Sequence, residues 1–410
     1  MNKALPLLFL VASFHAYSAQ DLRVSLLSFN GAQREAYDTI FEQFSQKHTN
    51  INLVVTNYEA EKYKSEIGDW LQTDKHSDIM YWFGGERLRS FVKQGLVKNL
   101  DETWQSNNWD ESFTTAAKSS VSFEDQKYGL PVHYYPWAMY YKKSLFERLG
   151  IVPPTTWEEF ISTSNKLKEN QITPIVVGSK NHWTLAAWFD YLNLRLNGLE
   201  FHLKLMNGDV SYKDNRVIKV FEVWSSLATQ NYFLAGHQNL TWREALPFLY
   251  RNKGGIMLMG NFWTSQIPPS LYDDIGMIRF PIIDSSLPVY EEAPTNVWMI
   301  PDNTQNKEGA ITLMEYLAEP QVQEELNSAI GMIAPSPTHK ASNDYFINRA
   351  YELLAKADGS SQFFDRDTLQ PIASKGIEQF SRFVSNVETL PDVLEELERL
   401  RIESKQGTNN

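Results

Sequence analysis

Apolar and polar residues follow two alternating periods along the first part of the chain. Residues 22–29 alternate as a half-buried strand does, and residues 51–55 and 78–82 are further short strand-like segments. Between them, residues 35–47 and 63–71 carry apolar side chains at helical spacing. Strands that alternate with helices predict parallel strand–helix–strand units, and hence an α/β fold.

A second region with the same alternation follows the aromatic stretch 134–141. Thr155 or Thr156 precedes Glu158 and Glu159, an arrangement typical of a helix start. The further strands that we predict are residues 172–177, 255–260, 275–281 and 297–300, and the further helices are residues 183–196, 216–227, 307–317, 321–330 and 390–405.

The N-terminus has the pattern of a secretory signal peptide. Residues 1–3 carry a positive charge, residues 4–14 form an apolar run, and residues 16–19 include small residues that suit cleavage. The apolar run is shorter than the roughly 20 residues that span a bilayer. A buried N-terminal helix is the alternative interpretation. We expect residues 1–19 to be removed and the mature protein to reside in the periplasm.

Composition restricts the partners of the chain. It has no cysteine, so we expect neither disulfides nor a lipid anchor on cysteine. The formal net charge is −12, whereas nucleic acids and anionic membranes favour partners rich in lysine and arginine. The sequence therefore predicts a protein with a large apolar core that binds no nucleic acid.

The sequence motifs of common enzyme classes are missing. The chain has no Walker loop, no dinucleotide glycine fingerprint, no G-x-S-x-G elbow and no H-E-x-x-H. Glu158–Glu159 fits a helix start and Glu291–Glu292 fits a loop, whereas a glycosidase needs two acids across a cleft. We therefore expect a binding protein rather than an enzyme, with no catalytic residue, no metal and no cofactor.

Four tryptophans stand beside turn-forming or polar residues on separate segments: Trp82, Trp137, Trp183 and Trp263. A tryptophan next to glycine or asparagine occupies a bend rather than the middle of a helix or strand. Flat aromatic faces at such positions suit the apolar faces of sugar rings, and nearby polar groups suit the sugar hydroxyls. This pattern indicates a binding cleft.

Five segments, in this order and spacing, carry a family resemblance. They are residues 77–82 with 95–100; 128–131 with 139–146 and 150–151; 153–160; 252–263; and 308–310 with 316–317 and 321–323. Through them the chain resembles the extracellular solute-binding proteins of ABC transporters, family 1, which bind sugars and include the maltose-binding proteins. The resemblance extends over nearly the whole mature chain.

The resemblance implies a two-lobed periplasmic binding protein type II fold with hinge strands between the lobes and the ligand in the cleft. Residues 20–134 and 295–335 would form the N-terminal lobe, and residues 135–294 and 336–410 the C-terminal lobe. The chain would cross near residues 132–136, 292–297 and 333–337. Pro294, Pro335 and Pro337 in the crossings limit the backbone conformations there.

The resemblance also implies stacking and polar ligand contacts. Trp82, Trp183 and Trp263 match positions where relatives place aromatic residues, and Glu86 and Arg87 stand near an acid–arginine pair that bonds sugar hydroxyls. This chain has one residue more in the turn before Glu86, which puts that register in doubt. A phosphate ligand would need several lysines or arginines, and because Arg87 is the single obvious candidate we favour a neutral sugar.

Further expected contacts depart from the pattern of the maltose-binding relatives. Gln33 stands where those relatives use charged residues, and Tyr135 stands where they use an acid, so specificity for maltodextrin does not follow. Asn261 follows the Gly260 turn, and Trp298 either contacts the ligand or packs the hinge. In an extended strand Tyr135 shares a face with His133 and Trp137, and we favour this face as the cleft wall.

The resemblance implies that the protein captures a mono- or oligosaccharide as a monomer and delivers it to an inner-membrane ABC permease. The alternative is a sensing role, in which the closed lobes dock on a chemoreceptor or a sensor kinase. The sequence does not separate these two roles, because both would use the same cleft and the same closure.

Overall fold

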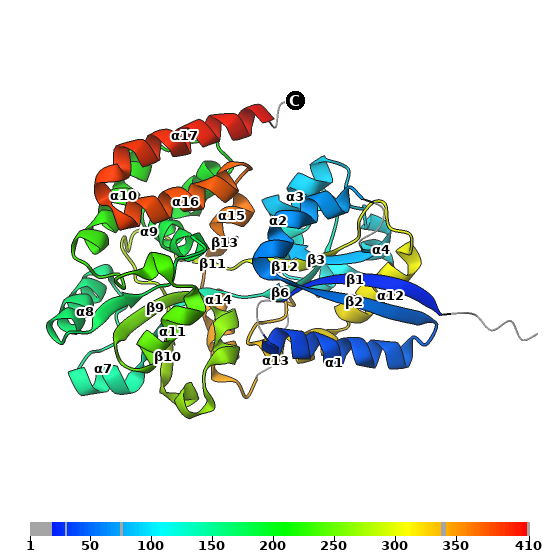
Figure 1. Ribbon diagram of the computed structural model, residues 1–410, viewed down its shortest axis with the longest axis horizontal. Coiled ribbons are helices and arrows are strands. Elements are labelled where there is room, and N and C mark those ends of the chain that lie inside the picture. The colour runs from blue at the N-terminus through cyan, green and yellow to red at the C-terminus, as the bar shows by residue number, and fades with distance from the viewer. Residues whose placement is uncertain (1–18, 29–30, 74–76, 338–341, 408–410) are drawn as a thin grey trace, which may run out of the picture.

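Two α/β lobes lie side by side and are joined by a narrow waist (Figure 1). The computed structural model describes residues 19–28, 31–73, 77–337 and 342–407. The predicted signal peptide lies outside these residues except for Ala19. Within the described residues, no helix combines the length and apolarity needed to cross a bilayer.

The first lobe is built on a five-stranded sheet in the order β2-β1-β3-β12-β6. Strands β1 (Gln20–Ser28), β2 (Ile51–Glu59) and β3 (Ile79–Phe83) are parallel. Strand β12 (Thr295–Met299) enters antiparallel between β3 and β6 (Leu130–Tyr134). Helices α1, α12 and α13 cover one face of this sheet, and α2 and α3 cover the other (Figure 1).

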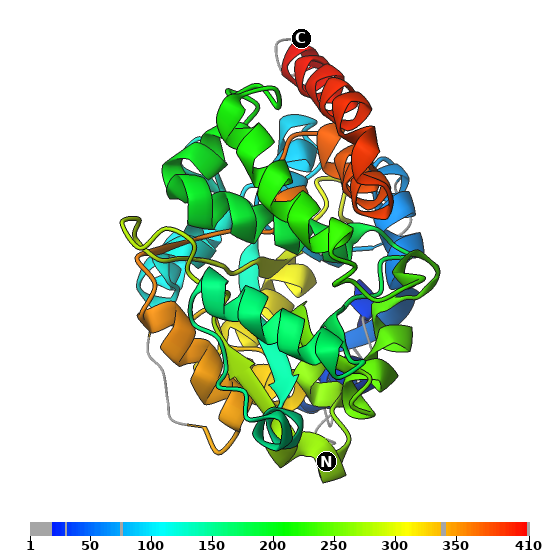
Figure 2. The ribbon, with the colours of Figure 1, turned by 90° about the vertical axis from the view of Figure 1, so that its left-hand side faces the viewer.

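The second lobe is built on a four-stranded sheet in the order β10-β7-β9-β8. Strand β7 (Trp137–Lys142) runs antiparallel to β9 (Gly254–Gly260) and to β10 (Ile275–Ile278), and β8 (Thr173–Val176) is parallel to β9. Helices surround this sheet, and the C-terminal helix α17 lies at the edge of the lobe (Figure 2).

The helices have the following bounds: α1 Gly31–Lys47, α2 Ala60–Leu71, α3 Glu86–Lys93, α4 Asp101–Ser106, α5 Trp109–Ser112, α6 Thr115–Ser120, α7 Lys143–Leu149, α8 Trp157–Glu169, α9 Ala186–Met206, α10 Asn215–Thr229, α11 Trp242–Tyr250, α12 Lys307–Ala318, α13 Pro320–Ile330, α14 Tyr345–Ala355, α15 Phe364–Asp367, α16 Ile372–Ser385 and α17 Leu390–Gly407. Short 3-10 helices are η1 Trp183–Leu185, η2 His237–Asn239, η3 Asn261–Gln266, η4 Pro269–Asp274 and η5 Val387–Thr389, and the small strands are β4 Ser122–Phe123, β5 Gln126–Lys127, β11 Tyr290–Glu292 and β13 Gly359–Ser361.

The chain passes between the two sheets in short segments at the waist. Tyr135 and Pro136 separate β6 of the first sheet from β7 of the second. Ala293 and Pro294 separate β11 from β12. Ile333 pairs with Tyr134 before the chain continues toward α14. Because the first two connections are only two residues long, the lobes can move about the waist while the crossings keep them together.

Both sheets are mixed, so the expectation of parallel strand–helix–strand units holds in the second region only for β8 and β9. Strand β12 returns from the second lobe and therefore enters the first sheet in the opposite direction. Strand β7 follows directly from β6 through the waist and pairs antiparallel with β9 and β10. Periodicity reports the element type and not its partner, so only the local β1–β2–β3 unit and the β8–β9 pair could be inferred in this way.

Each lobe buries a histidine in its uncharged form. In the first lobe, the Tyr37 hydroxyl lies 2.7 Å from Nε2 of His133, and Nδ1 of His133 lies 2.8 Å from the Asn327 side-chain oxygen. In the second, Asn193 donates to Nδ1 of His202 at 3.1 Å. Both rings are fully buried. Burial lowers the pKa of His133 to about 4 and that of His202 to about 3.

These histidines predict a loss of stability in mild acid. A histidine whose pKa is about 4 when folded and about 6.5 when unfolded leaves stability intact above pH 6.5. The unfolding free energy then falls as the pH drops, by roughly 3 kcal/mol at pH 4 for His133 alone. We expect His133→Gln to be less stable than the parent at pH 7 but to have a flatter pH dependence, as measured by urea unfolding.

Replacement of the partly exposed His48 by Gln is the control. In that variant, we expect the unfolding free energy to fall between pH 7 and pH 4 as steeply as in the parent. An unchanged slope in His133→Gln would contradict the assignment of His133 as a buried neutral side chain.

Candidate functional site

A cavity of about 40 Å³ lies at the waist, between the two lobes. Its volume holds a few water molecules, so a larger ligand needs the walls to move apart. The first lobe contributes Lys64 of α2 and Phe83 at the end of β3. The remaining walls come from the hinge and the second lobe: Tyr135, Trp137, Trp183, Phe262, Phe363, Asp365 and Arg366.

Aromatic rings form most of the wall. The ring of Trp137, at the start of β7, stacks on that of Phe363 with centroids 4.9 Å apart. The Trp183 ring stands edge-on to Trp137 at 5.9 Å, and the Phe262 ring does so at 6.3 Å. A Cβ on Gly260 would lie 2.5 Å from a Phe262 ring carbon, so glycine allows Phe262 to fold back toward the cavity.

One arginine joins the cavity to the hinge. Arg366 of α15 donates through Nη2 to the Tyr135 hydroxyl at 2.7 Å. Through Nη1 it donates to the Thr295 carbonyl at 3.2 Å and to the Asn296 side-chain oxygen at 2.9 Å. Because Thr295 and Asn296 begin β12 of the first sheet, this side chain of α15 contacts the first lobe as well.

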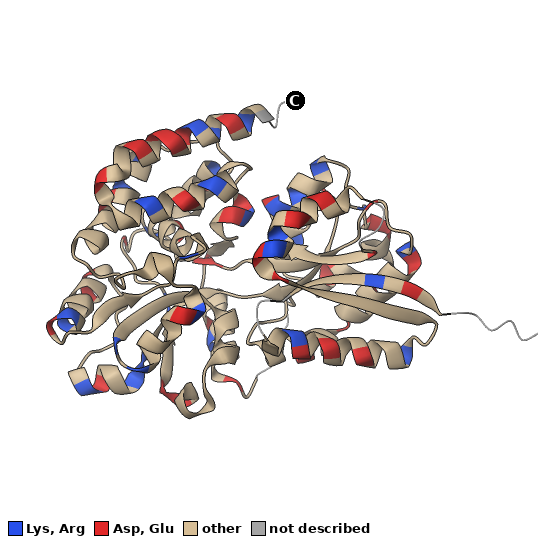
Figure 3. Cartoon of the chain, in the orientation of Figure 1, with Lys and Arg blue, Asp and Glu red and all other residues tan. Residues whose placement is uncertain are grey.

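An ion pair bridges the lobes beside the cavity. Nη2 of Arg87, on α3 of the first lobe, lies 2.5 Å from an Asp365 carboxylate oxygen, and Nε donates to the Asp365 carbonyl at 3.1 Å. Both side chains are only 12–13% exposed. Figure 3 shows acidic positions of α15 opposite basic positions of α2 and α3.

Glycine lets α15 approach α3 this closely. Gly85 precedes α3 and has a φ of +76°, in the left-handed region that favours glycine. A Cβ there would lie 2.5 Å from the Arg366 carbonyl oxygen. A larger residue at this position would push the two lobes apart.

Three acids near the cavity have raised pKa values; Asp190 and Glu292 are fully buried, and Asp367 is half-buried. Burial raises the pKa of Asp190 and of Glu292 well above their usual range, and it raises the pKa of Asp367 to about 6. Asp190 accepts a hydrogen bond from the Phe364 backbone at 2.8 Å. Among the described residues, neither carboxylate oxygen of Glu292 has a hydrogen-bond partner. Burial without an ion-pair partner therefore favours the uncharged form of Asp190 and Glu292.

Tyr135 and Trp183, among the predicted contacts, line the cavity, and so does Trp137. Arg87 stands behind the wall, through its ion pair with Asp365. The expected common face of His133, Tyr135 and Trp137 is only partly present. His133 belongs to the core of the first lobe, because the strand β6 that carries it ends at Tyr134 and the chain then leaves the sheet.

Trp82 and Trp263 do not line the cavity; the residue next to each one does. Trp82 is buried between Tyr63 and Phe91 and donates to the Arg87 carbonyl, whereas Phe83 lines the cavity. Trp263 packs on Tyr140 and Tyr250, whereas Phe262 lines the cavity. Phe83 is the last residue of β3, where adjacent side chains point to opposite faces, and Phe262 lies in the 3-10 helix η3 that follows β9. In both places an offset of one residue exchanges a core position for a cavity position.

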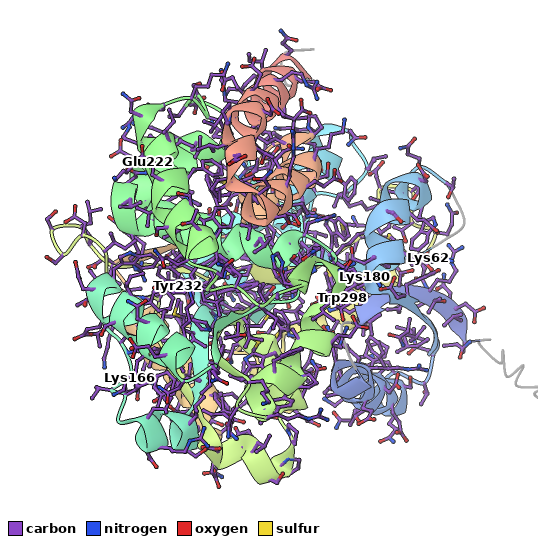
Figure 4. All side chains as sticks on the ribbon, turned by 60° about the vertical axis from the view of Figure 1, so that its left-hand side comes forward. Lys62, Lys166, Lys180, Glu222, Tyr232 and Trp298 are labelled. Carbon is purple, nitrogen blue, oxygen red and sulfur yellow. The ribbon has the colours of Figure 1, made fainter. Side chains whose placement is uncertain are left out.

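The other predicted contacts lie away from the cavity. Trp298 is fully buried in the first lobe, where it packs edge-on against Tyr37 and Tyr81, and Figure 4 shows it in the interior. Asn261 accepts from Tyr140 and donates to the Gly331 carbonyl. The remaining two are Glu86, which pairs with Arg89 and Lys93 on its own helix, and Gln33, which is buried in the first turn of α1.

Sequence reasoning missed the segment that completes the site. Residues 363–367 read Phe-Phe-Asp-Arg-Asp, an aromatic pair followed by alternating charges. The segment has no helical or strand period beyond one turn, α15. The feature that could have identified this segment is its aromatic and charged composition between Gly359 and Pro371, because two adjacent phenylalanines are unusual in a surface loop. Lys64 gave no signal, because it reads as the polar face of α2.

The described residues offer rings and charged donors to a ligand rather than a coordination site. Within the described part of the chain, no group of three or more His, Cys, Asp or Glu side chains is arranged to hold a metal ion. The cavity therefore suits a ligand with flat apolar faces and peripheral polar groups.

Comparison with known proteins gives one family. The model of the family described as bacterial extracellular solute-binding protein matches residues 30–324. An ABC transporter extracellular-binding protein of Pyrococcus horikoshii is 24% identical over 238 residues, which are 57% of this chain and 53% of that protein. A probable sugar-binding periplasmic protein of Mesorhizobium japonicum is 24% identical over 270 residues, 64% of this chain and 62% of that protein. This chain thus spans between half and two thirds of the length of these relatives.

Solved structures share the whole architecture. The bacterial solute receptor AcbH is described as having an exclusive preference for β-D-galactopyranose. It superposes on this chain with a TM-score of 0.86 at 25% identity, and the superposition covers 95% of this chain and 99% of the AcbH chain. A chitin oligosaccharide binding protein superposes with a TM-score of 0.85 at 18% identity and covers 94% of this chain and 99% of its own. These matches confirm the two-lobed α/β fold.

The ion pair between Arg87 and Asp365 predicts a measurable effect on the distance between the lobes. Charge-assisted hydrogen bonds contribute about 1.5 kcal/mol, roughly a tenfold change in an equilibrium. We expect Asp365→Asn to shift the protein toward more open forms about tenfold. Small-angle X-ray scattering would then report a larger radius of gyration than that of the parent.

Arg216→Gln is the matched control, because it removes an ion pair with Asp214 that lies entirely within the second lobe. Its radius of gyration should equal the parental value. Equal radii for the parent, Asp365→Asn and Arg87→Gln would show that this ion pair does not hold the lobes together.

Proposed function

Because this chain belongs to the bacterial extracellular solute-binding protein family, we propose that it captures a sugar between its lobes and delivers it to an inner-membrane ABC permease. The ligand class is a mono- or oligosaccharide. The observation that carries the proposal is the interlobe cavity walled by aromatic rings from both lobes. The relatives described as sugar-binding support the same ligand class.

The rings would supply the apolar contacts of the ligand. Trp183 is partly exposed beside the buried Trp137 and Phe363, so it offers part of its ring to a sugar that enters from the cleft. Phe83 offers a ring from the other lobe. Stacking on two lobes would give each face of a pyranose ring an apolar partner.

Polar side chains of the same cavity would satisfy the sugar hydroxyls. Tyr135, Asp365 and Arg366 carry hydrogen-bonding groups on the wall. A buried hydroxyl without a partner costs about 1–3 kcal/mol. These residues would therefore select a sugar by the positions of its hydroxyls, while the rings supply affinity that is less selective.

Ligand binding would favour the closed form of the protein. The lobes that we propose to move are residues 20–134 with 295–335, and residues 135–294 with 336–410. A sugar that contacts Phe83 on one side and Trp183 on the other binds the closed form better than the open one, and this difference in affinity drives closure. The closed form would then be the one that the permease recognises.

We propose that residues 1–19 are a cleaved signal peptide and that the mature protein acts as a monomer in the periplasm. We expect no hydrolysis of the ligand. Asp365 is the one carboxylate among the described residues that line the cavity, and it is paired with Arg87, whereas glycosidases use two acids. The ABC-transporter and sugar-binding descriptions of the relatives support transport rather than sensing.

Removing the Trp183 ring should weaken sugar binding and leave the fold intact. Loss of a buried aromatic contact of about 2 kcal/mol corresponds to roughly a 30-fold increase in Kd. We expect this increase for Trp183→Ala in calorimetric titrations with the sugar that gives the parent its largest thermal shift in a screen.

Trp157→Ala is the control, because Trp157 is also partly exposed but lies on α8, outside the cavity. It should bind the sugar as the parent does. The proposed site is wrong if Trp183→Ala binds with unchanged affinity while circular dichroism shows a native fold.

A further inference from the structure

The guanidinium of Arg366 is buried without an ionic partner. The side chain is only 6% exposed, and its hydrogen-bond acceptors are the Tyr135 hydroxyl, a carbonyl and an amide oxygen, all uncharged. A guanidinium has five N–H donors. Among the described residues, the N–H of Nε and one N–H of Nη2 have no acceptor. Arg366 also lines the cavity.

These two nitrogens form the edge with which arginine holds a carboxylate. In the same chain, Arg23 holds Asp78 through Nε and Nη2, each at 3.1 Å. Arg216 holds Asp214 through the same two nitrogens at 3.0 and 2.8 Å. The corresponding donors of Arg366 therefore suit a planar anion with two oxygens.

Three cations surround the ring of Phe83 in the cavity. The guanidinium carbon of Arg366 lies 4.3 Å from the ring centroid, that of Arg87 lies at 5.4 Å, and Nζ of Lys64 lies at 5.9 Å. Asp365 neutralises Arg87. Lys64 pairs at 3.0 Å with Glu61, whose side chain is 47% exposed, and such solvent-exposed partners contribute little.

Two of the three acids near the cavity, Glu292 and Asp190, do not offset the charge of Arg366. Glu292 is completely buried, and burial raises the pKa of its carboxyl well above its usual range. Burial does the same for Asp190. Asp367 accepts a hydrogen bond from the Gln362 backbone at 2.8 Å, and burial raises its pKa to about 6. At neutral pH Asp367 is therefore mostly ionised and offsets part of the charge of Arg366. With Arg87 neutralised by Asp365, the side of the cavity that contains Arg366 and Lys64 still carries excess positive charge.

We propose that the ligand is an acidic sugar, a uronic acid or an oligosaccharide that ends in one, whose carboxylate is held by Arg366 beside Phe83 and Tyr135. This proposal rests on the proposed function and narrows its substrate class. It replaces our preference for a neutral sugar, which assumed that Arg87 was the single cation of the site. A phosphate, with close to two negative charges at neutral pH, matches the single unpaired guanidinium less well than a carboxylate does.

Lys64 would make the same carboxylate favour closure. It belongs to α2 of the first lobe, whereas Arg366 belongs to α15 at the second. An anion between them would be attracted to both lobes at once. The charge of the ligand would then add to the aromatic contacts in stabilising the closed form.

Calorimetric titration of the mature protein tests the proposal with five probes: D-galacturonate, D-glucuronate, D-galactose, D-glucose and D-glucose 6-phosphate. We expect a uronate to bind at least tenfold more tightly than the neutral sugar with the same ring. We expect Arg366→Gln to weaken uronate binding about 10- to 100-fold, since hydrogen bonds to charged groups are the strong ones. Binding of the neutral sugar should weaken by a smaller factor, because only a hydrogen bond to an uncharged hydroxyl is lost.

Two further variants keep the test decisive if Arg366→Gln does not fold. Arg366→Lys keeps the charge and loses the two-nitrogen edge, so it should still weaken uronate binding. Lys64→Gln should weaken uronate binding about tenfold, whereas its control Lys62→Gln, on the exposed side of the same helix (Figure 4), should not.

The outcomes separate this inference from the proposed function. Tight binding of a neutral sugar or of glucose 6-phosphate, with weaker binding of both uronates, would overturn the acidic-sugar proposal and leave a sugar-binding protein. Uronate binding that is insensitive to both Arg366→Lys and Lys64→Gln would overturn it as well. Failure of all five probes to bind would contradict the proposed function for these sugars, and with it the inference.

Discussion

The close contact between α15 and the start of α3 is the constraint on which the site depends. Gly85 permits it, because any side chain there would meet the Arg366 carbonyl. The contact places the ion pair of Arg87 and Asp365 across the lobes and sets Arg366 against the first strand residues of β12. One turn of helix thus connects the second lobe, the hinge and the cavity wall, so a movement of either lobe must be accompanied by a rearrangement of these polar contacts.

Burial governs the electrostatics around this contact. Glu292 and Asp190 are completely enclosed and are therefore driven toward their uncharged forms. Arginine cannot give up its charge in the same way, so Arg366 stays cationic, and of the nearby acids with raised pKa values only Asp367 is mostly ionised at neutral pH. The favourable place for an opposite charge is then the cavity, where a ligand can bring one. The same desolvation that stabilises the neutral acids would, on our proposal, favour an anionic ligand.

Aromatic packing explains why only part of the site could be inferred from residue types. The four tryptophans at bends indicated the right region, and Trp137 and Trp183 do line the cavity. Trp82 and Trp263 instead fill the cores behind it, and Phe83 and Phe262, which are also buried, line the cavity. A large ring is equally suited to both environments. Which of two neighbouring rings faces the cavity is decided by the backbone at the end of β3 and in η3.

The sequence by itself determined the local elements, such as the amphipathic helix α1 and the capped start of α8, because hydrophobic period and capping act over one or two turns. Its five separated segments also indicated the two-lobed fold. Only the tertiary structure decided the strand partners of β12 and the union of Lys64, Phe83 and Arg366 in one cavity. These residues lie far apart along the chain, and their meeting follows from chain crossings at the waist that no local pattern encodes.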